Sequence, residues 1–352
     1  MTRVIQPVQR FFSVVPAAAA GGAIWNLSHL PLGWLMGAAL VTGVLAMSGV
    51  AITVPKRLHI AALVAIGTSV GLSLSPDVMT QIVTWAPLMA VAALLGISMA
   101  ALMAPLLALF GRMDRATAYF SLLPGGVIEM ATIAGHFGAD RTTIAVLHAV
   151  RVALVVIILP LALFSLFEHG PSAAVNLDGE SRWTMVLAAL AVGVCGGWIG
   201  ARCHLPASWL LGAVIAVGIA TGTGEIQTRF PSGLLALAQI AVGMTLGSRF
   251  ERNKLAAIPR ALAAGVPFLV AILTVMALFA GLCALFIPVD LSTLVLAFGI
   301  GGMAEMVLTA KALHQDVALV AAFQAVRGVA ANALAGPVWS WLTRNQSQHS
   351  GE

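Results

Sequence analysis

The sequence has very little charge. Only 9% of its 352 residues are charged, 60% are hydrophobic, and the mean hydropathy is +1.00. Soluble domains carry roughly 25% charged residues, so this composition is too apolar to cover a surface in contact with water. We therefore expect a polytopic membrane protein. No polar stretch is long enough to form a separate soluble catalytic domain or a DNA-reading module, so we expect no direct nucleic-acid partner.

Patterns that bind metal are also missing. The three cysteines form no Cys-x-x-Cys pair, and we interpret them as small apolar residues inside helices. The eight histidines show no His-x-His, His-x-x-His or His-Glu-x-x-His spacing. The sequence thus predicts no metal site and no cofactor, although residues far apart in the chain could still come together in space.

The chain contains one pattern twice. Residues 29–37 read HLPLGWLMG, and residues 204–212, 175 positions later, read HLPASWLLG. A nearly constant offset through Trp, His and charged residues indicates a duplication. We expect a first membrane repeat at 1–170, an acidic linker at 171–181, a second membrane repeat at 182–345 and a polar tail at 346–352. Farther along, the offset is 176 for Glu129 and Glu305, Asp140 and Asp316, and Arg151 and Arg327.

Each repeat has five apolar segments, most of them long enough to cross a bilayer, and one glycine-rich segment. The apolar segments lie at about 11–28, 31–53, 58–75, 86–110 and 142–167, and at about 183–201, 206–223, 231–248, 261–287 and 317–342. The glycine-rich segments lie at about 119–137 and 291–312.

The basic residues decide whether the glycine-rich segments cross the membrane. The formal net charge is +5, and the basic residues form short clusters between apolar runs. If these segments cross, the cluster Arg249, Arg252, Lys254 faces outside, against the positive-inside rule. If they enter and return, that cluster falls inside, and the exceptions are Arg182, Arg229 and Lys311.

We therefore predict an all-α polytopic membrane protein. It consists of two inverted five-helix repeats, with about ten transmembrane helices plus two re-entrant hairpins that enter from opposite faces. The N- and C-termini are expected in the cytoplasm, because most basic clusters then lie on that side.

Each glycine-rich segment places an acid inside an apolar run. The first reads Pro124-Gly125-Gly126-Val127-Ile128-Glu129-Met130, and the second reads Gly301-Gly302-Met303-Ala304-Glu305-Met306. Proline and paired glycines break a helix, and broken backbone survives at membrane depth only where protein or a watery cavity surrounds it. Glu129 and Glu305 could bind a coupling proton or sodium ion. The alternatives are close helix packing at the glycines and ion pairs between the acids and Arg151 or Arg327.

Polar side chains also recur in the last helix of each repeat. His148 and Arg151 share one helix face, and Gln324 and Arg327 occupy the equivalent positions. An arginine near mid-membrane can hold a carboxylate or phosphate group, which makes Arg151 and Arg327 candidates for orienting a solute. Pairing inside the protein is the alternative. For Asp140 and Asp316 we expect helix capping, and for Gly67, Gly71, Gly243 and Gly247 we expect close helix packing.

These motifs together resemble the integral-membrane AbrB duplication family of bacteria, over nearly the whole chain. They are the repeated His-Leu-Pro-x-x-Trp-Leu-x-Gly, the Pro-Gly-Gly-x-x-Glu-Met segment and the later His/Gln-x-x-Arg. Members carry two labels, ammonia monooxygenase and AbrB-type regulator, and the resemblance implies a multi-pass protein of the bacterial inner membrane without a settled substrate. The second copy departs from the pattern because Ile300 stands where the first has proline. The inferred layout is also similar to that of glutamate and citrate carriers.

The leading hypothesis is a secondary transporter of a small polar or anionic solute, coupled to protons or sodium, that works by alternating access. The site would comprise Gly125, Gly126, Glu129, His148, Arg151, Gly301, Gly302, Glu305, Gln324 and Arg327. The first alternative is a membrane protein that affects gene expression indirectly. The second, a monooxygenase, is disfavoured because the metal-ligand spacings are missing. We expect no enzymatic role; the partners are the solute or ion, the lipid bilayer and, by analogy with the carriers, a second copy in a homodimer.

Overall fold

The structure is a computed structural model that describes residues 7–28, 31–74, 78–166, 182–226 and 228–349. The described residues form fifteen α-helices and no strand. The predicted acidic linker at 171–181 lies outside the described residues. The last helix continues into the region predicted as a polar tail and ends at His349. The prediction of an all-α fold is confirmed.

Six helices are long and apolar enough to cross a membrane, at Val83–Gly111, Arg141–Ser165, Trp183–Arg202, Ser232–Ala257, Pro259–Ala284 and Val317–Arg344. Three shorter apolar helices cover Phe11–Leu27, Gly33–Met47 and Ser208–Gly222. The protein is therefore a multi-pass helical membrane protein by length and composition.

The helices follow one another in two similar series. The first series is α1 (Pro7–Leu27), α2 (Gly33–Met47), α3 (Lys56–Gly71), α4 (Val78–Gly111), α5 (Arg115–Leu122), α6 (Val127–Gly135) and α7 (Arg141–Leu166). The second is α8 (Trp183–Arg202), α9 (Ser208–Gly222), α10 (Ser232–Gly247), α11 (Arg252–Ala257) with α12 (Pro259–Ala284), α13 (Leu291–Phe298), α14 (Met303–Ala312) and α15 (Val317–His349). Both bounds of α2 and α9 differ by 175, and both bounds of α3 and α10, and of α5 and α13, differ by 176.

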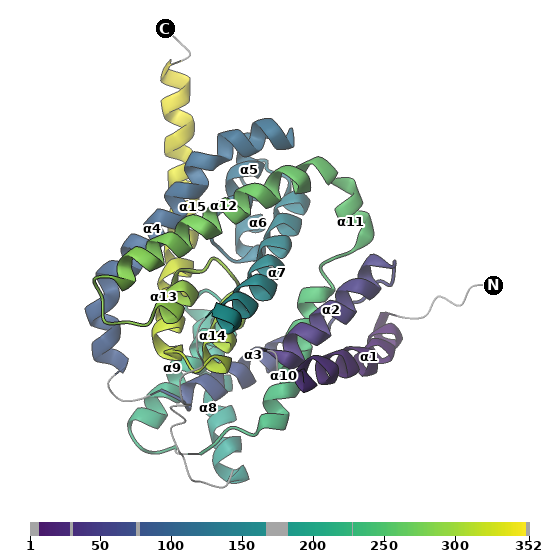
Figure 1. The fold of residues 1–352 in the computed structure, drawn as a ribbon, viewed down its shortest axis with the longest axis vertical. Helices are drawn as coiled ribbons and strands as arrows, with labels where there is room; N and C mark the ends of the chain where they lie inside the picture. The colour runs from purple at the N-terminus through teal and green to yellow at the C-terminus, as the bar shows by residue number, and fades with distance from the viewer. Residues whose placement is uncertain (1–6, 29–30, 75–77, 167–181, 227, 350–352) are drawn as a thin grey trace, which may run out of the picture.

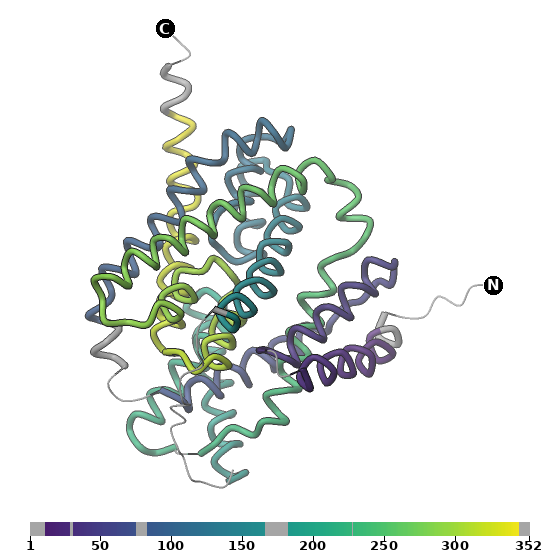
Figure 2. The backbone as a smooth tube through the Cα atoms, in the orientation of Figure 1, coloured from purple at the N-terminus to yellow at the C-terminus, as the bar shows by residue number. Residues whose placement is uncertain are grey.

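The helices pack as two groups, each built from both series. In the first, called the six-helix group, α2 packs on α1 and α10, and α9 packs on α8 and α3. The second, called the hairpin group, contains α4, α5, α6, α7, α12, α13, α14 and α15. Figure 1 shows the two groups side by side, and Figure 2 shows the chain passing from α10 through α11 into α12.

Glycines explain why helices from different series approach so closely. A Cβ on Gly67 of α3 would lie 2.6 Å from the backbone oxygen of Leu210 in α9. A Cβ on Gly243 of α10 would collide with the backbone oxygen of Leu35 in α2. The predicted close helix packing is therefore present at these two glycines, and it joins one half of the chain to the other.

Candidate functional site

The first glycine-rich segment is a hairpin of two short helices, α5 and α6, on either side of the break at residues 123–126. The backbone amide of Asp140, just before α7, donates to Thr117 Oγ1 at 2.8 Å. Both ends of the hairpin therefore lie at the start of α7. The break instead contacts Arg151, eleven residues farther along, or about 16 Å at 1.5 Å per residue. The chain thus runs inward alongside α7 and returns to the end where it began.

The second glycine-rich segment repeats this geometry with α13, α14 and α15. The amide of Asp316 lies 3.4 Å from its acceptor, Thr293 Oγ1, and Ser292 Oγ donates to Gln315 Oε1 at 2.7 Å. These contacts close the hairpin at the start of α15. Its break contacts Arg327, again eleven residues farther along. We call the two segments hairpin one (α5–α6) and hairpin two (α13–α14).

The two hairpins open toward opposite ends of the protein. In hairpin one, the hydroxyl of Tyr119 donates to the Ala335 carbonyl in α15 at 3.3 Å, and its ring stacks on Trp339 with centroids 5.4 Å apart. Ala335 lies nineteen residues beyond Asp316, which is about 28 Å along the helix. In Figure 1, hairpin one accordingly lies toward the C-terminal end of α15 and hairpin two toward the other end.

The two breaks meet in the middle. A Cβ added to Gly301, at the break of hairpin two, would lie 2.8 Å from Val155 Cγ1 in α7. Val155 is about one turn from Arg151, which holds the break of hairpin one. Residues 123–126 and 299–302 therefore lie near the same level of α7, although they are far apart in the sequence.

Arg151 binds the broken backbone of hairpin one. Its Nη1 donates to the Leu123 carbonyl at 2.6 Å, and its Nη2 donates to the Gly125 carbonyl at 2.9 Å. His148, one turn earlier, lies 2.9 Å from the Phe120 carbonyl through Nε2. Because a carbonyl can only accept, Nε2 carries the proton. Both side chains are buried, at 1% and 0% exposure, so they supply donors to carbonyls that the break in the helix leaves away from water.

Arg327 and Gln324 do the same for hairpin two. Arg327 donates to the carbonyls of Gly299 and, at 2.9 Å, Gly301. Gln324 Nε2 donates to Leu296 and Gly299, both at 2.9 Å. The alternative of pairing inside the protein thus describes these four side chains, but their partners are backbone carbonyls.

The predicted alternative of ion pairs with Glu129 and Glu305 is wrong for Arg151 and Arg327. Among the described residues, neither acid forms an ion pair. Each acid instead occupies the third position of its short helix, after Gly126 or Gly302 as the N-cap. A Cβ on Gly126 or Gly302 would collide with the carboxylate of its own glutamate, which folds back over the glycine. An acid in the first turn is favoured by the helix dipole.

The methionine that follows each acid packs against the first glycine of its pair. A Cβ on Gly125 would lie 2.7 Å from Met130 Cε, and one on Gly301 would lie 2.8 Å from Met306 Cε. In the Gly-Gly-x-x-Glu-Met motif, the first glycine therefore makes room for the methionine and the second for the carboxylate. This pairing explains why both glycines and the Glu-Met pair recur together.

Arg249 joins the site, although sequence reasoning placed it in a cytoplasmic basic cluster. It follows α10 in the six-helix group, is half-buried, and lies within electrostatic range of both Glu305 and Glu129. Its side chain makes no ion pair with either acid. One feature of the sequence sets Arg249 apart from its cluster: the equivalent position in the first repeat, at the 176 offset, is the uncharged Ser73.

The site retains unused polar atoms. The buried Nε atoms of Arg151 and Arg327, Nδ1 of His148 and Oε1 of Gln324 have no hydrogen-bond partner among the described residues. Within the described part of the chain, no group of three His, Cys, Asp or Glu side chains is placed to hold a metal. The arrangement offers two carboxylates, of Glu129 and Glu305, within electrostatic range of the Arg249 guanidinium.

Two further sequence predictions concern positions beside this site. Asp140 accepts from the amides of Thr142 at 2.9 Å and Thr143 at 3.3 Å, and Asp316 accepts from the amide of Leu319 at 2.9 Å. The predicted helix-capping role of both aspartates is confirmed.

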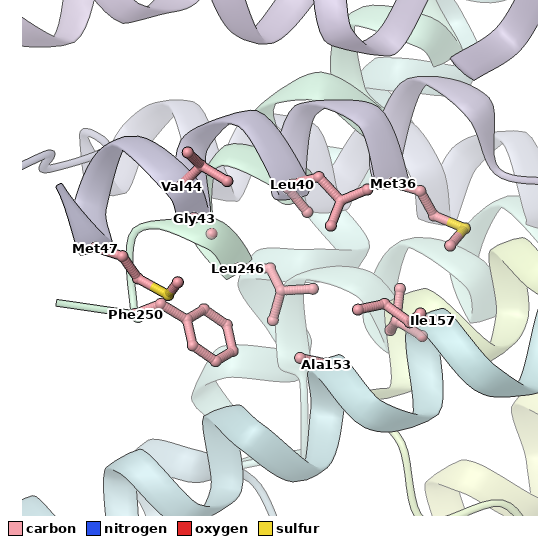
Figure 3. Close-up of a pocket in the computed structure, with 12 residues that line it drawn as sticks. Met36, Leu40, Gly43, Val44, Met47, Ala153, Ile157, Leu246 and Phe250 are labelled. Carbon is pink, nitrogen blue, oxygen red and sulfur yellow. The ribbon is translucent and has the colours of Figure 1, made fainter. Parts of the chain in front are cut away.

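A separate apolar cavity of about 240 Å³ lies between α2, α7 and α10. Figure 3 shows Leu40, Val44, Ile157 and Leu246 around it, with no charged side chain among its lining residues. It borders the two helix groups but contains none of the predicted site residues.

Comparison with known proteins gives one family. A family model described as transition state regulatory protein AbrB matches residues 7–343. The chain is 28% identical over 354 residues to "Uncharacterized protein YhjN" of Bacillus subtilis (strain 168), covering 93% of this chain and 92% of that protein. It is 25% identical over 313 residues to "Putative regulator AbrB" of Escherichia coli (strain K12), covering 85% and 86% respectively.

Proposed function

The chain belongs to the AbrB family, as its repeated motifs predicted, and we propose that it is a secondary transporter of a small polar or anionic solute. The observation that carries the proposal is the meeting of the two hairpin breaks. In this proposal, the two broken helices open toward opposite ends, and their breaks, which lie near the same level of α7, form a solute site that is reached from one side at a time. A protein with only a scaffolding role needs neither the breaks nor the acids beside them.

The proposed architecture is two inverted five-helix repeats with two re-entrant hairpins. The near-constant offset of helix bounds supports the duplication. Along α15, the mouth of hairpin two at Asp316 and the Tyr119 contact of hairpin one at Ala335 are about 28 Å apart, close to the ~30 Å thickness of a hydrocarbon core. Ten crossings then require α1 and the shorter helices α2, α3 and α9, of 15, 16 and 15 residues, to cross together with the longer helices.

In this proposal Glu129 and Glu305 bind the coupling proton or sodium ion. Both stand at helix N-termini beside the central breaks, and both are only half-buried, so an ion can reach them. Arg151 and Arg327 keep the two breaks open by holding their carbonyls. Their unpartnered Nε atoms leave one donor each for orienting a solute, which is the role that the sequence suggested.

The regulator label is compatible with an indirect effect. One relative is named as a regulator, and a transporter that changes the level of a solute can alter gene expression without touching DNA. We place the protein in the bacterial inner membrane because of its family, and its termini in the cytoplasm because of the distribution of basic residues. A homodimer is proposed only by analogy with the carriers.

The test is coupled flux in proteoliposomes. Solutes are screened as amino acids, carboxylates and amines across pH and sodium gradients, first with the wild-type protein. Glu129→Gln and Glu305→Gln, singly and together, are expected to abolish ion-coupled uptake while the protein still folds. Glu225→Gln, at an exposed carboxylate away from the hairpins, is the matched control and should be active. Undiminished coupled uptake by the folded double variant would remove the acids from the mechanism.

A further inference from the structure

The two hairpins are covered to different extents, although their motifs match. In α14 every residue from Met306 to Ala310 is buried, whereas in α6 only Met130 and Ala134 are. The pair at equivalent positions shows the contrast directly, because Ile128 is 76% exposed and Ala304 is 7% exposed. One hairpin is packed against a neighbour that the other lacks.

The neighbour of α14 is α3 of the six-helix group, and Lys311 fastens the contact. Lys311 Nζ donates to the Ser69 carbonyl at 2.7 Å and to Ser69 Oγ at 2.5 Å, and it lies 3.4 Å from Ser73 Oγ. Ser69 and Ser73 lie at the C-terminal end of α3, where the helix dipole favours a cation. This contact closes the gap between the two helix groups on the side of hairpin two.

Among the described residues, the side of hairpin one has no hydrogen bond equivalent to those of Lys311. At the 176 offset, α6 corresponds to α14 and α10 corresponds to α3, yet α6 packs mainly on α5, α7 and α15, and α10 is not among its main neighbours. The counterpart of Lys311 is Gly135, and the counterpart of Ser73 is Arg249. On this side the cation contributed by the six-helix group is Arg249, whereas on the other side the hairpin contributes Lys311. The guanidinium of Arg141, at the start of α7, packs against Gly135.

Arg249 is placed to bridge α6 and the end of α10. It lies within electrostatic range of Glu129 and Glu305 but is paired with neither, and it makes no side-chain hydrogen bond to a described residue. A charge in this position gains interaction energy when the uncovered face of α6 approaches the end of α10. The same movement would separate Lys311 from Ser69 and Ser73.

We propose that the structure is one of two states, and that in the other state the exposed face of α6 packs on the C-terminal end of α10, with Arg249 between Glu129 and Glu305. This inference rests on the proposed transporter function. Lys311 holds the gate on the hairpin-two side closed, and Arg249 closes the gate on the hairpin-one side. Two halves related by a repeat exchange their conformations, so a contact found in one half appears in the other half in the alternate state.

The experiment uses cysteine labelling and needs no known solute. In a background with Cys195, Cys203 and Cys283 replaced by Ser, Thr132→Cys reports on the α6 face and Leu308→Cys on the equivalent α14 face. Thr132 is exposed and Leu308 is 2% exposed, so a soluble maleimide should react much faster with Thr132→Cys. Lys311→Ala should reverse this order, because loss of its charge-assisted bonds shifts the equilibrium by about tenfold or more.

Cross-linking identifies the new neighbour. Thr245 is the counterpart of Ser69, so a short bis-maleimide should join Thr132→Cys to Thr245→Cys in the Lys311→Ala variant and much less in the parent. Lys311→Arg, which keeps a cationic donor, and Lys254→Ala, an exposed lysine paired with Glu251, should both behave like the parent. Ser73→Ala, a milder change, should give a smaller shift in the same direction and covers the case in which Lys311→Ala does not fold.

Unchanged labelling and cross-linking in both Lys311→Ala and Ser73→Ala would overturn the proposal. The same holds for a Lys311→Ala variant whose Thr132→Cys stays open without joining α10. These readouts do not depend on flux. A gate that moves in a protein without transport activity would refute the proposed function alone, whereas coupled transport without the movement would refute the gate alone.

Discussion

Replacing Arg151 by Leu tests whether the arginine holds the break of hairpin one. Arg151→Leu keeps a long apolar side chain and removes both donors, to Leu123 at 2.6 Å and to Gly125 at 2.9 Å. The Leu123 carbonyl keeps a second bond, from the Gly125 amide at 2.9 Å. The Gly125 carbonyl is left in a buried position without another donor.

The magnitude follows from these two bonds. Hydrogen bonds to charged groups contribute about 1.5–3 kcal/mol each in soluble proteins, whereas interhelical bonds in a membrane protein average about 0.6 kcal/mol. Removing a buried charge offsets part of the loss. We expect about 3 kcal/mol of destabilisation, which at roughly 2 °C per kcal/mol lowers the melting temperature by about 6 °C.

The assay is thermal unfolding of the purified protein in one detergent, followed by tryptophan fluorescence. His148→Gln is the matched control, because Gln324 already performs the equivalent task in hairpin two, where its Nε2 donates to the Leu296 carbonyl at 2.9 Å. It should unfold within about 1 °C of the parent. A melting temperature for Arg151→Leu that equals the control would show that the broken backbone does not depend on the arginine.

Three further predictions concern single positions. Gly126→Ala should displace the Glu129 carboxylate from its position over the glycine and reduce coupled flux at least about tenfold. The melting temperature should change little, because the displaced group is the end of a flexible side chain. Retained flux would show that this position of the carboxylate does not matter for transport. Gly67→Ala should destabilise the protein by about 1–3 kcal/mol, because the added Cβ meets the backbone of α9. Gly233→Ala, with open space around the glycine, should not destabilise it. Equal thermal unfolding of the two variants would argue against the close approach of α3 and α9. Asp140→Ala should cost about 1 kcal/mol through loss of the helix cap in the same unfolding assay, and an unchanged curve would remove that role.

Much of the site could be predicted from local patterns. Proline and glycine act through their own backbone, so the helix breaks at 123–126 and 299–302 can be predicted from the sequence alone. The aspartate caps are local in the same way, because each carboxylate binds amides two or three residues away. The offset of 176 found both copies of each motif because it compares residue types that are rare in an apolar chain.

Partners across the fold could not be predicted in this way. Whether Arg151 meets an acid, a solute or a carbonyl depends on what lies opposite α7, and spacing along one helix carries no such information. The sequence predicts Arg249 in a cytoplasmic basic cluster with Arg252 and Lys254, and only packing brings it near Glu129 and Glu305.

The sequence by itself therefore determined that this is a helical membrane protein, that its two halves carry the same motifs, and where its helices break, since composition, periodicity and backbone preference are properties of short segments. Only the tertiary structure decided which groups share the centre and that one hairpin is covered while the other is open. Those outcomes depend on packing between segments more than a hundred residues apart, such as Lys311 against Ser69, and a linear pattern does not encode that distance.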